Sequence, residues 1–476
     1  MTFQSPTATG AEIAAAVRER RVTAREVTEE TLARVADTHT ALNAFTTVTA
    51  ERALAEADVV DAAVAAGRDP GPLAGVPYSV KNLFDLEGVV TVAGSKINRD
   101  DPPARADATC VARLRAAGAV CLGAVNMGEY AYDFVTQNAH DGTTRNPRDL
   151  QRSAGGSSGG SGAAVAAGLG AISIGTDTNG SIRVPSSFCG VWGLKPTYGR
   201  LSRAGAFPFV DSLDAIGPLA RCVADLATCF DVMQGPDPRD PVVTSRAVER
   251  IGVRFETQDE SSDLRIATLG GYFGSGGEAE VHEAVARVAR ALGVGREVEL
   301  PQPALARTAA YLITAAEGGA LHRERLLARA EDFDPAARDR LIAGALAPAA
   351  WYVQAQKFRA WWKEQVARVF REVDVLIAPA TPIRAPIIGQ STLVFAGREL
   401  PLRPNIGVFT QPITLIGLPV VAAPIRMPDG LPVAVQLVGP PYSELRLLRV
   451  ARALERAGVC AAAPESRLPS AGTPVV

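Results

Sequence analysis

Residues 155–185 read GGSSGGSGAAVAAGLGAISIGTDTNGSIRVP. Two loops rich in small polar residues flank a helix-forming segment, residues 163–167, and a short apolar segment, residues 172–174. Runs of glycine and serine are usually flexible linkers, but a linker is not followed at once by a helix start and a buried strand. The stretch therefore predicts a helix and a strand inside an α/β core, with loops that turn sharply.

The same alternation of helical and strand patterns recurs along the chain. A helical pattern over 108–117 leads into a buried strand over 119–122, and a strand over 264–269 precedes a helix over 278–292. A further strand pattern, 373–378, ends before a proline. This order of elements is typical of α/β proteins with a parallel or mixed sheet.

We expect one domain over residues 1–476, because α/β enzymes of this length often form a single unit. Thr23 followed by Glu26 is a capping-box signature of a helix start. A stretch rich in proline and polar residues predicts a flexible connection between two halves. The expected parts are an N-terminal helical region about 1–70, a core about 71–235, the connection about 235–263 and a second half about 264–476.

The charges of the chain are nearly balanced, with 49 Lys and Arg against 51 Asp and Glu. No basic block is interleaved with aromatic residues, so we expect no nucleic-acid contact and no polybasic membrane patch. The longest apolar run is too short to span a membrane, and nothing at the N-terminus resembles a signal peptide. The six cysteines show no C-x-x-C spacing. These features predict a cytoplasmic protein that acts on a small molecule.

The segment from Gly175 to Ser181 places a hydroxyl beside free backbone donors. Consecutive N–H groups near one hydroxyl can form an oxyanion hole, in which one donor lowers the barrier by about 3 kcal/mol. Asn179 stands where glycine would be the easiest choice, and we expect a positive φ there, which asparagine tolerates. Glycine-rich loops at helix starts also bind phosphate. Nucleotide binding is therefore an alternative at this point, although no Gly-Lys-Ser/Thr follows.

A serine nucleophile requires a base, and the chain offers two kinds. Of its four histidines, His140 is the one near the serine segments in sequence, and a Ser-His pair is one alternative. Lys81 follows the strand-like residues 73–80, which would bury its amine. Burial lowers the pKa of a lysine, so that the neutral amine can accept a proton. A lysine that reaches the surface is the other interpretation of this segment.

Lys81 and the two glycine- and serine-rich segments together resemble the amidase signature family. The resemblance is carried by residues 75–81, 155–161, 175–183, 189–197, 379–382, 417–419 and 431–439. It covers nearly the whole chain. It implies a single α/β/α domain built on a large mixed, mostly parallel central sheet that helices cover.

The family resemblance also implies a Ser-Ser-Lys triad. Matching positions give Ser181 as the nucleophile, Ser157 as the bridging hydroxyl and Lys81 as the base. The implied oxyanion donors are the backbone N–H groups of Thr178, Asn179, Gly180 and Ser181. The reaction passes through an acyl-enzyme on the serine and requires no metal and no organic cofactor.

Two further structural features follow from the resemblance. The peptide bond between Gly156 and Ser157 is expected to be cis, as it is in the family. Asp177 and Arg183 are expected to hold the nucleophile loop through charge-assisted hydrogen bonds.

Residues 94–100, 126–132 and 177–187 resemble the branch of the family that contains the 1-carboxybiuret hydrolase of cyanuric acid degradation. This closer resemblance implies hydrolysis of a small, urea-like, carboxylated amide with release of ammonia.

Tyr132 and Ser158 are the residues expected to bind the substrate. A substrate carboxylate also requires a cation in the pocket, for which Arg307 and Arg403 are candidates.

Other functions remain open from the sequence. The chain also resembles the glutaminase-type amidase subunit of a tRNA-dependent amidotransferase, and a general aliphatic or aryl amidase is a further alternative. A catalytically silent binding scaffold is the alternative without enzymatic activity. The first alternative and the 1-carboxybiuret hypothesis both suggest a small helical accessory subunit, within a homodimer or a heterotetramer.

Overall fold

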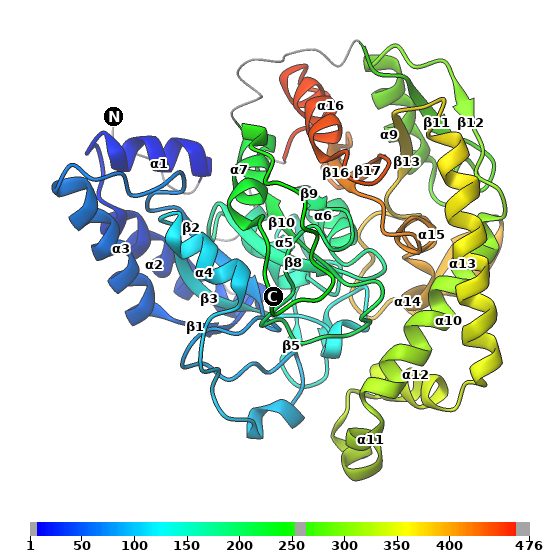
Figure 1. The fold of residues 1–476 in the computed structure, drawn as a ribbon, viewed down its shortest axis with the longest axis horizontal. Coiled ribbons are helices and arrows are strands. Elements are labelled where there is room, and N and C mark those ends of the chain that lie inside the picture. The colour runs from blue at the N-terminus through cyan, green and yellow to red at the C-terminus, as the bar shows by residue number, and fades with distance from the viewer. Residues whose placement is uncertain (1–6, 253–262, 463–476) are drawn as a thin grey trace.

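The computed structural model of the chain describes residues 7–252 and 263–462. These residues form an 11-stranded sheet with the order β1-β3-β2-β8-β10-β9-β16-β17-β13-β11-β12. Its strands are β1 (Phe45–Val48), β2 (Pro77–Lys81), β3 (Val120–Val125), β8 (Ile172–Asp177), β9 (Trp192–Lys195), β10 (Ala215–Ala220), β11 (Ile266–Leu269), β12 (Glu297–Val298), β13 (Val375–Pro379), β16 (Val420–Arg426) and β17 (Pro432–Val438). The sheet runs through the middle of the molecule (Figure 1).

The large mixed sheet is confirmed, but its description as mostly parallel is wrong. Among the described strands, four neighbouring pairs are parallel and six are antiparallel. A parallel pair needs a crossover of a dozen or more residues. β16 and β17 are joined by residues 427–431 alone, so they can pair only as a hairpin.

Helices pack on the sheet, as the α/β expectation requires. The α-helices of the described residues are α1 (Gly10–Arg18), α2 (Ala24–Leu42), α3 (Ala50–Ala65), α4 (Thr109–Ala116), α5 (Gly159–Ala166), α6 (Arg183–Cys189), α7 (Val223–Met233), α9 (Ala279–Ala291), α10 (Pro303–Leu321), α11 (Arg323–Arg329), α12 (Pro335–Ala345), α13 (Ala349–Val369), α14 (Leu402–Asn405), α15 (Gln411–Thr414) and α16 (Glu444–Arg456). The capping box at the start of α2 is confirmed, because Thr23 and Glu26 bond each other's backbone N–H groups. The helix and strand expected around residue 118 are α4 and β3.

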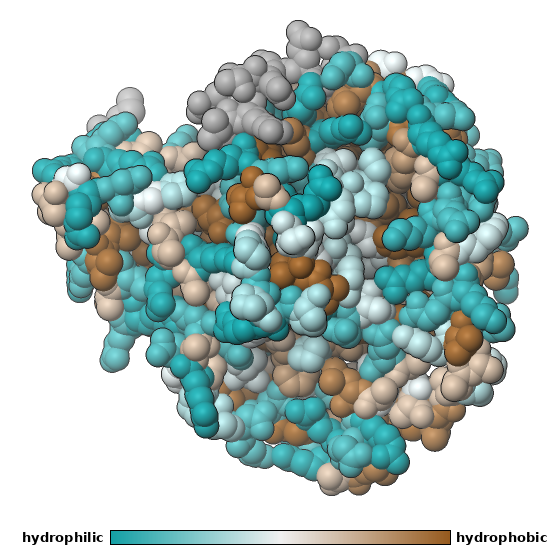
Figure 2. All heavy atoms as spheres, viewed as in Figure 1, coloured by the Kyte–Doolittle hydropathy of each residue, from teal (hydrophilic) through white to brown (hydrophobic). Residues whose placement is uncertain are grey.

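A helical arm stands at one end of the sheet. It consists of α10, α12 and α13, in which α10 packs on both other helices and also on α15 (Figure 1, right). Leu346 and Trp351 are exposed on it, and Figure 2 shows brown apolar side chains scattered over this side of the molecule. The arm matters for the site, because α10 and α12 face the loop that follows β8.

The expected flexible connection lies partly outside the described residues, since 253–262 are not among them. Its described part is bonded to the core. Asp240 pairs with Arg203 at 3.1 Å, and the Thr244 N–H donates to the Gly199 carbonyl at 2.7 Å. The division of the domain into two halves stays a prediction.

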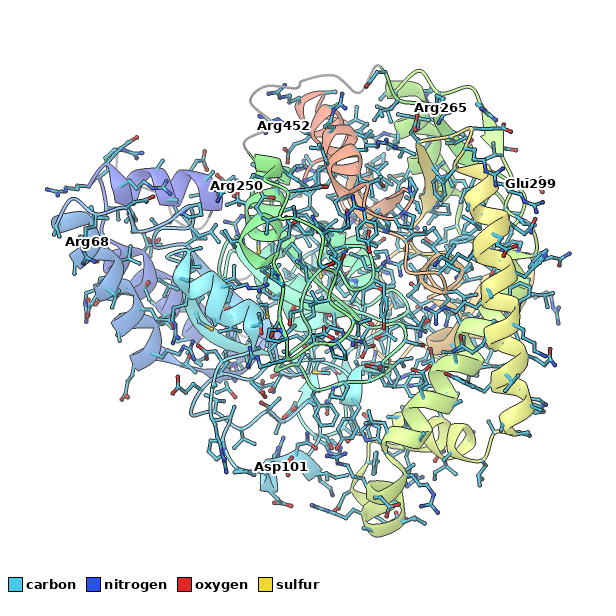
Figure 3. The ribbon with its side chains drawn as sticks, viewed as in Figure 1. Arg68, Asp101, Arg250, Arg265, Glu299 and Arg452 are labelled. Carbon is cyan, nitrogen blue, oxygen red and sulfur yellow. The ribbon has the colours of Figure 1, made fainter. Side chains whose placement is uncertain are left out.

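Many charged side chains project outward from the edge of the molecule. Side chains such as Arg68, Asp101 and Glu299 project from the rim of the molecule (Figure 3). All six cysteines are free thiols. Within 7–252 and 263–462, no helix is both long and apolar enough to cross a bilayer.

Candidate active site

The ends of β2 and β8 bring the predicted base to the predicted bridging serine. Lys81 is the last residue of β2, and β8 runs parallel to β2 at its side. The Lys81 Nζ atom lies 2.7 Å from Ser157 Oγ and 2.8 Å from Thr176 Oγ1. Lys81 and Ser157 are both fully buried, so the alternative of a surface lysine is excluded.

Burial lowers the pKa of Lys81 to about 7, although Asp214 and Asp177 act in the opposite direction. A desolvated ammonium is unfavourable, and neither hydroxyl partner supplies a negative charge to stabilise it. A large fraction of the amine is therefore neutral near pH 7 and able to accept a proton.

The glycines around Ser157 are required by close backbone approaches. A Cβ on Gly156 would lie 2.6 Å from the Val135 nitrogen, and one on Gly160 would lie 2.5 Å from the Asn126 backbone. Neither contact leaves room for a side chain. The expected cis bond between Gly156 and Ser157 is present.

Ser158 connects the two loops of the site. Its Oγ lies 3.2 Å from the Thr176 carbonyl oxygen, and its backbone N–H donates to the Ser181 carbonyl at 3.3 Å. The residue is fully buried. This geometry fits a residue that positions the nucleophile loop, while a contact between Ser158 and the substrate stays a prediction.

A buried ion pair holds the loop that carries Ser181. Both side chains of the Asp177–Arg183 pair are inaccessible to solvent, and their closest atoms are 2.8 Å apart. The carboxylate also accepts the Ile182 N–H at 3.2 Å. Burial alone would raise the pKa of Asp177, but the Arg183 guanidinium outweighs it and the pKa is lowered. The expectation of a charge-assisted anchor is confirmed.

The turn of this loop occurs at Gly180 and not at Asn179. Gly180 has a φ of 137°, whereas Asn179 is not among the residues with positive φ. The expectation for Asn179 was therefore wrong, because the neighbouring glycine supplies the special conformation. In the described structure, no hydrogen bond occupies the N–H groups of Thr178, Asn179, Gly180 and Ser181. These groups are free to act as oxyanion donors, which remains their predicted role.

A pocket opens beside Ser181. Its lining includes Tyr132, Thr178, Asn179, Ser181, Thr314 and Arg340. Tyr132 therefore lies where the sequence predicted it, at the pocket wall. Burial raises the pKa of its phenol, and the neighbouring Tyr311 of the pocket wall acts in the same direction.

Arg340 is the cation that the sequence did not reveal. Its guanidinium carbon lies 4.0 Å from the centre of the Tyr132 ring, and the group donates to the Tyr132 and Ala336 carbonyls. None of these partners among the described residues is a carboxylate. A positive charge without a counter-charge at a pocket wall can bind a substrate anion.

The two arginines considered from the sequence are engaged elsewhere. Arg403 lies 3.5 Å from Asp133, and Arg307 donates to Gln411 and to the Pro404 carbonyl. Neither belongs to the pocket lining. His140 lies 3.1 Å from Glu129, so the structure gives no support to a Ser-His pair.

A second pocket adjoins the first on the side of Lys81. It includes Thr176 and Asp214, and it shares Ala131, Thr178 and Phe209 with the Ser181 pocket. Asp214 accepts the Thr178 hydroxyl at 2.6 Å, and burial raises its pKa. The site is thus approached by two pockets with a common wall.

Comparisons with known proteins show the family of the chain. The Amidase family model matches residues 26–448. The chain is 52% identical to AtzE, a subunit of the 1-carboxybiuret hydrolase of Pseudomonas sp. (strain ADP), over 94% of this chain and 98% of that protein. It is 38% identical to a subunit of the glutamyl-tRNA(Gln) amidotransferase of Carboxydothermus hydrogenoformans, over 94% of this chain and 96% of that protein.

A solved structure of an s-triazine catabolic enzyme from "an unexpected vestigial protein complex" superposes with a TM-score of 0.94 at 50% identity. The match covers 96% of this chain and 100% of the other. Family model, relatives and fold therefore agree over nearly the whole chain. The chain belongs to the amidase signature family and is a hydrolase of amide bonds.

Proposed function

We propose that the protein removes ammonia from a small, urea-like, carboxylated amide of the 1-carboxybiuret type through an acyl-enzyme on Ser181. The observation that carries the proposal is the buried contact of 2.7 Å between Lys81 Nζ and Ser157 Oγ. It is supported by a pocket lined by Ser181 and by Arg340, whose described partners are carbonyl oxygens and the Tyr132 ring. The similarity to the 1-carboxybiuret hydrolase subunit supports the choice of substrate.

The chemistry begins with the neutral amine of Lys81. It takes the proton of Ser157, which takes the proton of Ser181, and the Ser181 oxygen attacks the amide carbonyl. The N–H groups of residues 178–181 stabilise the oxyanion. The proton returns to the leaving nitrogen, which departs as ammonia. Water then hydrolyses the acyl-enzyme, a carbamoyl-serine for a urea-like substrate, by the same relay and releases a carbamic acid.

Arg340 binds the substrate carboxylate in this proposal. A carboxylate alone does not separate the substrate from glutamine, which also carries an α-ammonium group. Asp133 is the carboxylate in the described pocket lining, and it already accepts the Phe134 N–H at 2.7 Å and pairs with Arg403. These contacts engage the Asp133 carboxylate, which reduces its capacity to bind an α-ammonium and supports a urea-like substrate over glutamine.

We also propose that a small helical accessory subunit binds this chain and that the assembly is a homodimer or a heterotetramer. The support is that one relative belongs to a hydrolase made of subunits, while another was solved in a protein complex. A cytoplasmic location and a lack of nucleic-acid contact are proposals that rest on the balanced charge.

Ammonia release tests the proposed function. The purified protein is assayed with 1-carboxybiuret, biuret, glutamine, an aliphatic amide and an aryl amide, with Ser181→Ala as the blank. Preference for the biuret-type compounds supports the proposal. Activity confined to glutamine would replace it with the glutaminase alternative, and activity confined to simple amides would indicate a general amidase.

A further inference from the structure

The backbone conformation at position 179 does not require an asparagine. Because Gly180 supplies the turn, residue 179 does not have to be asparagine for its conformation. The side chain is nearly buried, with 7% of the residue exposed. Its Nδ2 atom donates to Thr314 Oγ1 at 2.8 Å, which links the nucleophile loop to α10.

The other end of the same amide is unsatisfied. Asn179 Oδ1 is buried and has no hydrogen-bond partner, and Asn179 lines the pocket that includes Ser181. Buried acceptors in proteins are nearly always paired. A pocket that holds such an acceptor is complementary to a ligand that brings a donor to it.

The position of Asn179 limits which ligand atom that donor can be. Its backbone N–H is a predicted oxyanion donor, so its side chain starts close to the scissile carbonyl. An amide side chain is short and reaches the atoms bonded to that carbonyl carbon. In a urea-like substrate the atom on the acyl side of this carbon is an N–H, whereas in glutamine or another alkyl amide it is a CH₂ group.

We infer that Asn179 is a specificity-determining residue whose Oδ1 accepts the N–H on the acyl side of the scissile carbonyl, so that the enzyme selects ureido substrates over alkyl amides. The inference rests on the proposed function and names the atom, Asn179 Oδ1, that gives the preference for ureido substrates. A site built to bond an N–H discriminates strongly against an analogue without that group, because the acceptor is then left unpaired.

Thr314 is the positioning residue for this acceptor. It is almost fully buried, with 1% exposed, and lies on a helix that packs on α12, the helix of Arg340. Its bond to Nδ2 holds one end of the amide, so that Oδ1 is the end left without a partner. One pair of helices thereby orients both the acceptor for the N–H and the cation for the carboxylate.

The test uses two pairs of substrates that differ in one group, with NH replaced by CH₂. These are N-carbamoylglycine against succinamate, and biuret against malonamide. Wild type, Asn179→Ala and Thr314→Val are compared by ammonia release. We expect Asn179→Ala to lose about 10- to 100-fold in kcat/KM for each ureido member and less than about threefold for each alkyl member. Thr314→Val should show the same selectivity with a smaller loss.

The outcomes separate the inference from the function on which it rests. Equal losses on both members of each pair would overturn the role of Asn179 and leave the proposed function intact. A wild type that releases ammonia from the alkyl members but from neither ureido compound would overturn both. Thermal unfolding identifies a variant that fails to fold. If Asn179→Ala fails to fold, the test rests on Thr314→Val, which leaves the Asn179 side chain in place. A loss of kcat/KM in Thr314→Val that is equal for ureido and alkyl substrates contradicts the inference.

Discussion

The Lys81 Nζ atom lies 2.7 Å from Ser157 Oγ, across a sequence separation of 76 residues. The contact joins the end of β2 to the loop before α5, and solvent reaches neither side chain. The described partners of the amine are two hydroxyl groups, those of Ser157 and Thr176. An amine bound by hydroxyls and not by carboxylates is readily neutral, which is the condition for its use as a base.

Replacing Lys81 by methionine should abolish turnover while leaving the fold in place. Methionine fills a similar volume but cannot accept a proton, and loss of a general base lowers kcat by about 10²- to 10⁴-fold. Steady-state ammonia release measures the effect. Lys357→Met is the matched control, because Lys357 is an exposed lysine on α13, and its activity should equal that of wild type. A Lys81→Met enzyme with normal turnover would remove the lysine from the mechanism.

The pH profile should have an acid limb near the pKa of Lys81, which is about 7. The amine must be neutral to accept a proton, so kcat/KM should rise about tenfold per pH unit below that value and level off above it. A profile that is flat, or that falls as the pH rises through neutrality, would contradict this assignment.

Two other buried groups titrate in the same range and provide controls for that profile. Burial also brings the pKa of Lys195 and that of Glu129 to about 7. Lys195→Met and Glu129→Gln should keep the acid limb at its position. If the acid limb disappears in one of these variants, the residue replaced in that variant, and not Lys81, causes the limb.

Arg340→Met should weaken the binding of carboxylated substrates and spare neutral ones. Loss of a charge-assisted contact should raise KM for N-carbamoylglycine by about 10- to 100-fold, with little change in kcat for biuret. The matched control is Arg338→Met on the same helix, whose guanidinium pairs with Asp339 outside the pocket. Equal effects on charged and neutral substrates would argue against carboxylate binding by Arg340.

Asp177→Asn should destabilise the protein through the nucleophile loop. It removes the charge that compensates the fully buried Arg183, and breaking such a pair costs about 3–5 kcal/mol of unfolding free energy. Urea denaturation measures it. The exposed pair of Arg290 and Glu283 is the comparison, because surface pairs contribute about 1 kcal/mol or less. A loss for Asp177→Asn no larger than that of the surface pair would contradict its role as an anchor.

Local patterns were sufficient to predict the catalytic segments. The loop after β8 and the glycines around Ser157 are contiguous in sequence, and the backbone approaches at Gly156 and Gly160 explain why no other residue fits there. The apolar strand before Lys81 suggested a buried amine but left a surface lysine as the other interpretation, and the structure shows that Lys81 is buried. These features depend on short stretches of chain, which is why the sequence reveals them.

Features that depend on packing between distant segments were not predictable. Arg340 lies on a helix without any local signal, and it reaches the pocket only because α12 packs on α10. The mostly parallel sheet was a wrong expectation because strand order and direction are set by long-range pairing. The role proposed for Asn179 likewise depends on Thr314, which is 135 residues away.

The rate of Ser181→Ala with a urea-like carboxylated amide tests the central claim most directly. Ammonia release by wild type and by this variant is measured side by side at equal protein concentration and at a pH above 7, with thermal unfolding to confirm that both are folded. The account predicts that the variant loses about 10³-fold or more in kcat, because it lacks the hydroxyl that forms the acyl-enzyme. Ammonia release by folded Ser181→Ala at a rate near that of wild type would contradict it.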